Sequence, residues 1–543
     1  MIVPAYLILT RRGGAYGSVM ATLASSGDAA KCICLRTNRR QINRRQTNSR
    51  QTNSRQTNRK ATALPSLQTA FRAASPRAAV PPTPAASVLI HGFVLALWLV
   101  LLARAFGGGG VVAWSTGIVY VGYDTLLLGF VAWQTFRLWT PPRKPAQGGP
   151  PISLGVIVAA HNEAAILPRT LACLFAQTDA PDQIFVTDDG SVDGTAELLA
   201  SYGLVQPPLG GMSEPSSRHP SLRWLRLPHA GKASALNAAL GHVDTDVLLT
   251  VDADTLLHEG AIAAMRQAFA ADAALVAATG VLTPLCGPGP SGRFFEWFQT
   301  YEYIRNFLSR YAWSRLDSLL LISGAFAGFR RAAVVEVGGF DADCLVEDYE
   351  LIHRLLRFSA QHGRGWHSAV LGRARALTDA PGTAGAFLRQ RRRWFGGFLQ
   401  TQYWYRDMVG NRRYGWLGMA MLPVKAADTL QPIYGLTALG LLAWFLGTGQ
   451  YAVLVPAAGV MVAKIVIDLS FHMWSVVLYR RWTGDDRSTR LDHALLAALA
   501  EPFTFQVFRH TGAALGWFVF LTGRRNWGTQ SRFGAVSAGD TPR

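Results

Sequence analysis

Four clusters of acidic or basic residues lie between residues 150 and 400, and their side chains suit metal-assisted chemistry on a diphosphate. They are Asp188-Asp189, Asp252-Ala253-Asp254, Glu347-Asp348 and Gln390–Trp394. Carboxylates can bind a divalent cation or accept a proton, and arginines can bind phosphate oxygens. Apolar segments long enough to cross a membrane flank the clusters on both sides. The combination predicts an enzyme domain framed by membrane helices.

Asp252 and Asp254 end the apolar run VLLTVDAD, which is typical of a buried strand. Two carboxylates, one residue apart, would then emerge at the edge of a sheet. Mg²⁺ is usually held by one or two carboxylates together with substrate phosphates, and such an ion would neutralise a leaving diphosphate. Acids also follow strands in ordinary solvated loops, so this pair predicts a metal site only in the company of the other clusters.

Asp188 and Asp189 follow a second apolar strand, in the string QIFVTDDG. A carboxylate at this place can accept a hydrogen bond from a nucleobase or a ribose hydroxyl, and Gly190 lets the backbone approach a ligand closely. An Asp-Gly turn that Asp193-Gly194 continues explains the same residues. Both interpretations stay open from the residues alone.

Glu347 and Asp348 offer a general base for an acceptor hydroxyl, which contributes roughly 10²–10⁴-fold to a rate. Acidic residues at the start of the helix expected over 348–358 would also be favoured by its dipole, and the two readings are compatible. In Gln390–Trp394, guanidinium groups could clamp a diphosphate and Trp394 could lie against a sugar ring. The alternative is a basic interfacial helix anchored by aromatic residues.

Residues 150–400 predict a soluble α/β domain, because short β-branched runs alternate with stretches of helical character. This alternation is typical of a mainly parallel sheet with helices on both faces, whose ligands bind at the carboxyl ends of the strands. Both aspartate clusters fall at such ends. The expected strands are Gly155–Ala159, Ile184–Thr187 and Val247–Val251, and the expected helices are Glu163–Gln177, Thr195–Tyr202, Lys232–Gly241 and Gly260–Ala271.

Two apolar runs, Val88–Ala103 and Val111–Trp133, precede this domain. A spanning helix needs about 20 apolar residues, so residues 85–140 are expected to form two transmembrane helices. Arg137, Arg143 and Lys144 follow the second run, which predicts that the next domain lies on the positive, cytoplasmic side.

Apolar runs return after residue 410. Residues 401–525 are expected to form interface helices and three to four further transmembrane helices, followed by a polar tail over 526–543. Lys464 and Asp468 lie four residues apart inside such a run, so they share a helix face and are expected to pair. That pair would be either part of a functional path or a structural salt bridge, and Asp124 invites the same two readings.

Residues 1–84 carry most of the excess positive charge, with 14 Lys or Arg against one acid in a chain of net charge +19. The repeat Gln-Thr-Asn-Ser-Arg at 46–50 and 51–55 is almost without apolar residues, so the whole segment is expected to be a basic, low-complexity disordered tail. The tail could bind anionic lipid or be an organellar transit peptide. It could also result from a start codon assigned too far upstream. Nucleic-acid binding is disfavoured, because no aromatic residues alternate with its arginines. We expect the tail to be dispensable for activity.

Seven motifs follow one another along this part of the chain. They are Val158–Glu163, Asp188–Ser191, Gly231–Asn237, Asp252–Asp254, Ser323–Phe326, Glu347-Asp348 and Gln390–Trp394. In this order they resemble the processive family-2 glycosyltransferases, such as bacterial cellulose, hyaluronan, chitin-oligosaccharide and poly-N-acetylglucosamine synthases. The likeness covers residues ~150–400, and the flanking apolar runs agree with it in arrangement. No further domain is evident after residue 525, which favours the poly-N-acetylglucosamine or chitin-oligosaccharide type.

The resemblance implies a cytoplasmic GT-A domain, Rossmann-like with a mainly parallel sheet, and inverting transfer from a UDP-sugar with Mg²⁺ or Mn²⁺. Asp348 would be the catalytic base, Asp252 and Asp254 the metal ligands, and Trp394 the acceptor contact. The nucleotide-sugar contacts would be Glu163, Asp188, Asp189, Lys232, Asp252, Gln390 and Arg393. This chain has His161 where the family usually has Tyr or Phe, and Val346 where Thr is frequent. Neither change removes a charge that the chemistry needs.

The expected protein is thus an integral, multi-pass membrane enzyme that adds sugars to a growing β-linked glycan for export. Its partners would be a UDP-sugar, a glycan acceptor, membrane lipid and an accessory export subunit, with no nucleic acid. Transfer of a single sugar to a lipid or protein acceptor is the alternative, and the Gln390–Trp394 motif favours the processive reading. A non-catalytic sugar-binding or transport protein is disfavoured, because the acidic residues of the site are all retained.

Overall fold

The computed structural model describes residues 66–107, 111–140, 150–485 and 490–523. Eight strands form one sheet in the order β3-β2-β1-β4-β7-β6-β8-β5. The strands are β1 (Leu154–Ala160), β2 (Gln183–Asp189), β3 (Leu222–Leu227), β4 (Val247–Asp252), β5 (Thr255–Leu257), β6 (Leu275–Leu285), β7 (Phe326–Arg330) and β8 (His367–Asp379). Strands β1, β2 and β4 match the three predicted from the sequence.

The half of the sheet formed by β3, β2, β1 and β4 is wholly parallel, and its register brings the aspartate clusters to one edge. Ala160 pairs with Asp188, and Ala159 pairs with Asp252, so the last residues of three strands stand side by side. The other half is mixed, because β7 runs antiparallel to both β4 and β6, and β5 runs antiparallel to β8. The predicted mainly parallel sheet is therefore confirmed in the half that carries the aspartates, and the antiparallel strands are additions.

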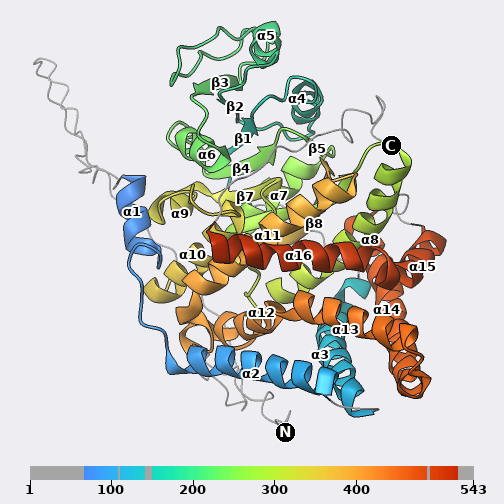
Figure 1. Cartoon of the computed structure of the whole chain (residues 1–543). Coiled ribbons are helices and arrows are strands. Elements are labelled where there is room, and N and C mark those ends of the chain that lie inside the picture. Colours follow the sequence, from blue (N-terminus) through green and yellow to red (C-terminus); the bar gives the residue numbers. More distant parts are fainter. Residues whose placement is uncertain (1–65, 108–110, 141–149, 486–489, 524–543) are drawn as a thin grey trace, which may run out of the picture. The chain divides into compact units, whose positions relative to one another are not determined.

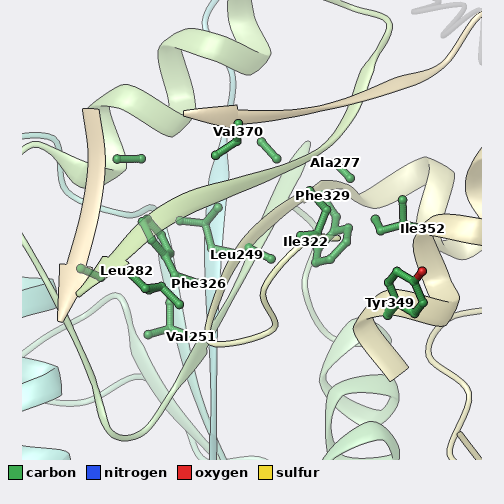
Figure 2. Close-up of a cluster of buried hydrophobic side chains, with 14 of the residues drawn as sticks. Leu249, Val251, Ala277, Leu282, Ile322, Phe326, Phe329, Tyr349, Ile352 and Val370 are labelled. Carbon is green, nitrogen blue, oxygen red and sulfur yellow. The ribbon is translucent and has the colours of Figure 1, made fainter. Parts of the chain in front are cut away.

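Apolar side chains of the central strands form the core behind this edge (Figure 2). Leu249 and Val251 of β4 are buried with Phe326 and Phe329 of β7. Close packing here depends on a small residue, since a Cβ at Gly280 would lie 2.2 Å from the Phe326 ring. Strands β2 and β4 each end in an aspartate immediately after this rigid core, which fixes where these site residues emerge.

Helices cover the sheet and connect its strands (Figure 1). The N-terminal and domain helices are α1 (Leu67–Ala74), α2 (Ala85–Gly107), α3 (Val111–Thr135), α4 (Leu167–Phe175), α5 (Thr195–Ser201), α6 (Lys232–Leu240), α7 (Ala261–Ala271), α8 (Pro290–Ser314), α9 (Arg331–Glu336), α10 (Glu347–His362) and α11 (Ala384–Trp404). The C-terminal helices are α12 (Leu422–Asp428), α13 (Gln431–Gly447), α14 (Tyr451–Thr483), α15 (Leu491–Ala500) and α16 (Phe505–Thr522). Helices α4 to α7 follow the predicted ones, with α4 shorter at both ends.

Two helices among the described residues are long and apolar enough to cross a membrane, over Ala85–Arg104 and Ala458–Thr483. The helices over Leu417–Asp428 and Gln431–Gly447 meet at a bend of 40° and would make a third span if counted as one. The two helices expected within residues 85–140 are present as α2 and α3. The number of crossings and the side on which the catalytic domain lies stay predictions.

Residues 66–84 correct the prediction of a disordered tail over 1–84, whose earlier part lies outside the described residues. Ser66 caps α1 by accepting a hydrogen bond from the Thr69 N–H, and Ala70 and Ala74 are buried. Arg77 then donates to Asp341 at 2.8 Å and to Asp343 at 2.7 Å. The sequence suggested disorder because the repeat that precedes α1 is polar. Helix α1 nevertheless has a short apolar face, and that face packs against the rest of the domain.

Helices α11 and α16 lie side by side (Figure 1). Glycines permit this contact, because a Cβ at Gly516 would lie 2.7 Å from Cβ of Phe395, and one at Gly512 would lie 2.6 Å from Cβ of Arg391. Residues from the end of the chain are therefore packed directly against the helix that carries the Gln390–Trp394 motif. This contact holds α11 in place beside the site.

Candidate active site

Lys232 is the first residue of α6 and places its ammonium group among the carboxylates at the sheet edge. Its Nζ forms an ion pair with Asp252 and lies 3.8 Å from Glu347 Oε1. Burial by itself lowers the pKa of Lys232, but the charges of Asp252, Glu347 and Asp348 outweigh it, so the pKa is raised. Lys232 therefore stays protonated. It is a fixed positive charge between Asp252 at the end of strand β4 and Glu347 at the start of helix α10.

Asp254 has the electrostatics expected of a cation ligand. Its side chain is buried, and burial together with the nearby charges of Asp252 and Asp379 raises its pKa well above the ordinary value, with Lys232 opposing. Three carboxylates thus share a small volume with one ammonium group. Oxygen donors in excess of local positive charge suit Mg²⁺ or Mn²⁺, which would relieve this repulsion. The residues present therefore fit the predicted metal, and Asp379 joins the predicted pair.

Asp189 organises the loop before α6. Its two carboxylate oxygens accept hydrogen bonds from the Ala230 N–H at 2.8 Å and the Gly231 N–H at 2.9 Å. Oδ2 also lies 2.9 Å from Nδ1 of His229. The adjacent Asp188 instead accepts from the Ser191 N–H at 2.8 Å, which closes the turn after β2. The turn reading thus holds for Asp188, whereas Asp189 faces the site.

Two histidines complete this corner, one of which the sequence analysis did not single out. The rings of His161 and His229 stack with their centroids 4.2 Å apart, and Nδ1 of each lies within hydrogen-bonding distance of the Asp189 carbonyl oxygen. Glu163 lies buried nearby, and its carbonyl accepts the N–H groups that begin α4. His229 lies two residues before the Gly231–Asn237 motif, and that position was the available signal.

Asp348 is held in one orientation at the start of α10. Its Oδ2 accepts the Gly324 N–H at 2.6 Å, and Oδ1 accepts the N–H of Tyr349 at 2.8 Å. A Cβ at Gly324 would lie 2.8 Å from Oδ2, so glycine allows this approach. Glu347 beside it is buried, and its pKa is raised by burial and by Asp348, with Lys232 acting in the opposite direction. The pair is thus fixed between Lys232 and the Ser323–Phe326 motif.

Helix α11 contributes the basic motif. The buried Gln390 Oε1 has no hydrogen-bond partner, and Arg391 donates to Glu302 at 2.6 Å. Arg393 donates to the carbonyl of Leu345 at 3.0 Å, next to the loop that leads to Asp348. The Arg391 guanidinium lies 4.7 Å from the Trp394 ring centroid. The motif is therefore joined to the loop that leads to Asp348 instead of forming an exposed interfacial helix.

One cavity of about 1630 Å³ collects these groups. All the predicted site residues line it except Asp188. It also reaches Asp124 of α3 and both Lys464 and Asp468 of α14, where Lys464 forms ion pairs with the two aspartates. The predicted pairing of Lys464 and Asp468 is confirmed, and Asp124 joins it. The space beside the sheet edge is thus continuous with space among the apolar helices.

The sequence matches the family model described as Glycosyl transferase family 2 over residues 155–338, and that of Glycosyl transferase family group 2 over residues 247–464. The two matches include every predicted site residue. The chain carries a family-2 glycosyltransferase domain. This confirms the family expected from the seven motifs.

Curated relatives include the poly-beta-1,6-N-acetyl-D-glucosamine synthases of Staphylococcus aureus (strain COL), 28% identical over 244 residues, and of Staphylococcus epidermidis, 26% identical over 257 residues. The matched regions cover 44% and 46% of this chain, and 53% and 56% of the relatives, so the chain spans about half the length of each.

Solved structures similar to this glycosyltransferase include a mannosyltransferase, PcManGT, from Pyrobaculum calidifontis in complex with GDP-Man and Mn²⁺. It is 20% identical with a TM-score of 0.45, over 77% of this chain and 99% of that one. Another is glucosyl-3-phosphoglycerate synthase from Mycobacterium tuberculosis, at 16% identity and a TM-score of 0.25, over 40% of this chain and 68% of that one.

Proposed function

We propose that this glycosyltransferase transfers a sugar from a UDP-sugar to a growing β-linked glycan, with inversion at the anomeric carbon. The observation that carries the proposal is the single cavity. It brings together a candidate metal site, a fixed base and a phosphate-binding motif from segments up to about 140 residues apart, and it extends among the apolar helices. N-Acetylglucosamine is the first sugar to test, because it is the unit named for the curated relatives.

The donor would bind along the sheet edge. Lys232 supplies a permanent positive charge there, and Gln390 and Arg393 supply further polar groups from α11. The orphaned Gln390 Oε1 is an acceptor that a ligand donor would satisfy. Mg²⁺ or Mn²⁺ held by Asp252 and Asp254 would neutralise charge on the leaving diphosphate. The nucleoside would lie toward Glu163 and Asp189.

Asp348 would act from the other side of the anomeric carbon. Its carboxylate takes the proton of the acceptor hydroxyl while that oxygen bonds to the anomeric carbon, and the bond from this carbon to the diphosphate oxygen breaks. UDP leaves with the bonding electron pair. The Gly324 N–H fixes the carboxylate, so little reorganisation is needed at the moment of transfer. Trp394 offers an apolar face to the acceptor sugar.

The product chain would then occupy the part of the cavity among the helices. Paired charges line that part, including Lys464 with Asp124 and Asp468. We propose that the enzyme is a multi-pass membrane protein with the domain of residues 150–400 on the cytoplasmic side, and that an accessory subunit and membrane lipid assist export. The alternative to repeated transfer is transfer of a single sugar to a lipid acceptor, and the experiment must distinguish the two.

The test is the product of the purified full chain supplied with UDP-N-acetylglucosamine and Mn²⁺. Mass spectrometry should show a series of products that differ by one sugar residue, and methylation analysis should give a β-linkage. Products that never exceed one added sugar, with any acceptor offered, would replace the processive proposal by the single-transfer one. The Asp254→Ala variant should give neither a product series nor a single-transfer product.

A further inference from the structure

Arg310 differs from the other cationic residues that line the cavity. Within the described residues, each of the others has a protein partner. The pairs are Lys232 with Asp252, Arg305 and Arg509 with Glu501, Arg391 with Glu302, Arg393 with the Leu345 carbonyl, Lys425 with Asp428, and Lys464 with Asp124. Nε and Nη1 of Arg310, by contrast, are covered from solvent and have no hydrogen-bond partner.

The surroundings of Arg310 hold its guanidinium group without satisfying it. The group lies over the Phe307 ring, with its central carbon 4.5 Å from the ring centroid. Stacking of this kind uses the flat face of the guanidinium and leaves its N–H groups to point outward in the plane. Burial lowers the pKa of Arg310 to about 10, so the group is still charged at neutral pH. It is therefore a rigidly placed hydrogen-bond donor.

Leaving a charged donor covered and unpaired is costly, so such groups are usually completed by ordered water or by a ligand. Two nearby groups oppose the effect of burial on the pKa of Arg310, first Tyr303 and then the proposed base Asp348. Asp348 thus supplies electrostatic compensation, although no hydrogen bond joins the two groups. Arg310 has a counter-charge nearby, but its Nε and Nη1 have no hydrogen-bond acceptors. The hydroxyl and amide oxygens of a neutral sugar would be such acceptors.

The fold places Arg310 on the helix side of the cavity. Helix α8, which carries it, packs against α3 and α14. Asp124, Lys464 and Asp468 of those two helices line the same cavity as Arg310 and Asp348. This is the part of the cavity in which the proposed function puts the glycan.

We propose that Arg310 is an acceptor-binding residue, which donates hydrogen bonds to oxygen atoms of the acceptor's terminal sugar and orients its hydroxyl toward Asp348. This inference rests on the proposed function. It adds to the site a residue of α8 that lies outside all seven sequence motifs. Arg310 would act in acceptor binding and have no role in binding UDP.

The experiment compares Arg310→Ala and Arg310→Lys with Arg315→Ala in the full-length protein, purified in detergent. Arg315 is an exposed arginine at the end of the same helix and does not line the cavity, so it controls for loss of charge. Release of UDP from UDP-N-acetylglucosamine is measured against a β-1,6-linked N-acetylglucosamine tetrasaccharide. Binding of UDP with Mn²⁺ is measured by calorimetry.

Arg310→Ala should raise the KM for the tetrasaccharide about 10- to 100-fold, as expected for loss of a charge-assisted hydrogen bond. The Kd for UDP should stay within about twofold of the wild type, and Arg315→Ala should change neither value. Added guanidinium ion should restore part of the activity of Arg310→Ala, which it would not do if the side chain only packed against Phe307. Arg310→Lys keeps the charge but loses the fork of donors, so its KM for the tetrasaccharide should lie between those of the wild type and Arg310→Ala.

Two outcomes would overturn the inference. A weakened Kd for UDP with an unchanged KM for the tetrasaccharide would assign Arg310 to the diphosphate. Unchanged kinetics in Arg310→Ala and Arg310→Lys would leave the residue a packing element. Absence of UDP release from the wild type with every donor and acceptor would instead refute the proposed function, so the two failures can be distinguished.

Discussion

Replacing Asp348 with asparagine removes the proposed base and one of the two hydrogen bonds that orient it, because the amide nitrogen cannot accept the Tyr349 N–H. Asparagine has nearly the same size, and its side-chain oxygen can still accept the Gly324 N–H that now reaches Oδ2 at 2.6 Å. An amide oxygen is far too weak a base to take a proton from a sugar hydroxyl. General-base catalysis is worth about 10²–10⁴-fold, so turnover should fall by that factor, equivalent to about 3–5 kcal/mol of transition-state stabilisation.

The assay measures UDP release at saturating UDP-N-acetylglucosamine, together with the Kd of UDP. The Kd should change by no more than about threefold, because Lys232, Asp252 and Asp254 keep their places in Asp348→Asn. Asp272→Asn is the matched control, since Asp272 is a half-exposed carboxylate outside the cavity and should tolerate the same change. Turnover of Asp348→Asn within threefold of the wild type would refute the base assignment. A large loss of UDP binding would show that Asp348 serves the donor.

Other changes test the supporting structure. Arg77→Ala should lower the free energy of unfolding by about 1–2 kcal/mol at pH 8 and by less at pH 5. Burial and Glu350 raise the pKa of Asp341 from its ordinary value of 3.8 to about 6 against the opposing charge of Arg77, so the native state binds this proton more tightly than the unfolded state. The contribution of Asp341 to stability therefore falls as pH rises from about 4 to 6. Without Arg77 the pKa of Asp341 rises further, so the fall continues to higher pH. Equal losses of stability at pH 5 and pH 8 in a denaturation series would contradict this. Deleting residues 1–65 should leave UDP release intact, whereas deleting 1–84 should reduce it, because α1 and Arg77 contact the loop that leads to Asp348; equal activity of the two truncations would show that the contact is unimportant. Trp394→Ala should raise the KM for a glycan acceptor by about tenfold and leave UDP binding unchanged, and the opposite pattern in the same assays would place Trp394 on the donor side.

The sequence allowed good predictions wherever the local pattern and the chemistry agreed. Strand β4 ends with Asp252 because an apolar run must be buried and the charged residue after it must not. Parallel pairing then brings Asp189 and Asp252 to one edge, as expected from the alternation of strands and helices. The family of the domain followed from the order of the motifs.

Other features depend on tertiary contacts that no local pattern shows. Asp188 and Asp189 are adjacent and alike in sequence, yet one closes a turn and the other holds the loop before α6. Asp379 joins Asp254 only because β8 returns beside β5. The stacking of His161 on His229 likewise joins residues 68 positions apart.

The disorder expected of residues 1–84 was wrong in its last part for a related reason. A short segment with few apolar residues cannot fold alone, but α1 packs on a surface that other parts of the domain provide. Gly338, with a backbone φ of +92°, leaves room for the Phe71 backbone, which a Cβ there would approach to 2.2 Å. The buried Arg354 lies 4.6 Å below the Phe71 ring. Only the folded domain shows that this segment has a place to bind.

The most direct test of the central claim is UDP release by the purified protein across four donors, UDP-N-acetylglucosamine, UDP-glucose, UDP-glucuronate and UDP-galactose, with Mg²⁺ or Mn²⁺. We expect release with one donor, abolished by a chelator and by Asp254→Ala and restored to the chelated wild type by added metal. Release that persists in the chelated enzyme or in Asp254→Ala would contradict the metal-dependent mechanism. Silence with every donor, in protein that is folded, would contradict the assignment of a UDP-sugar transferase.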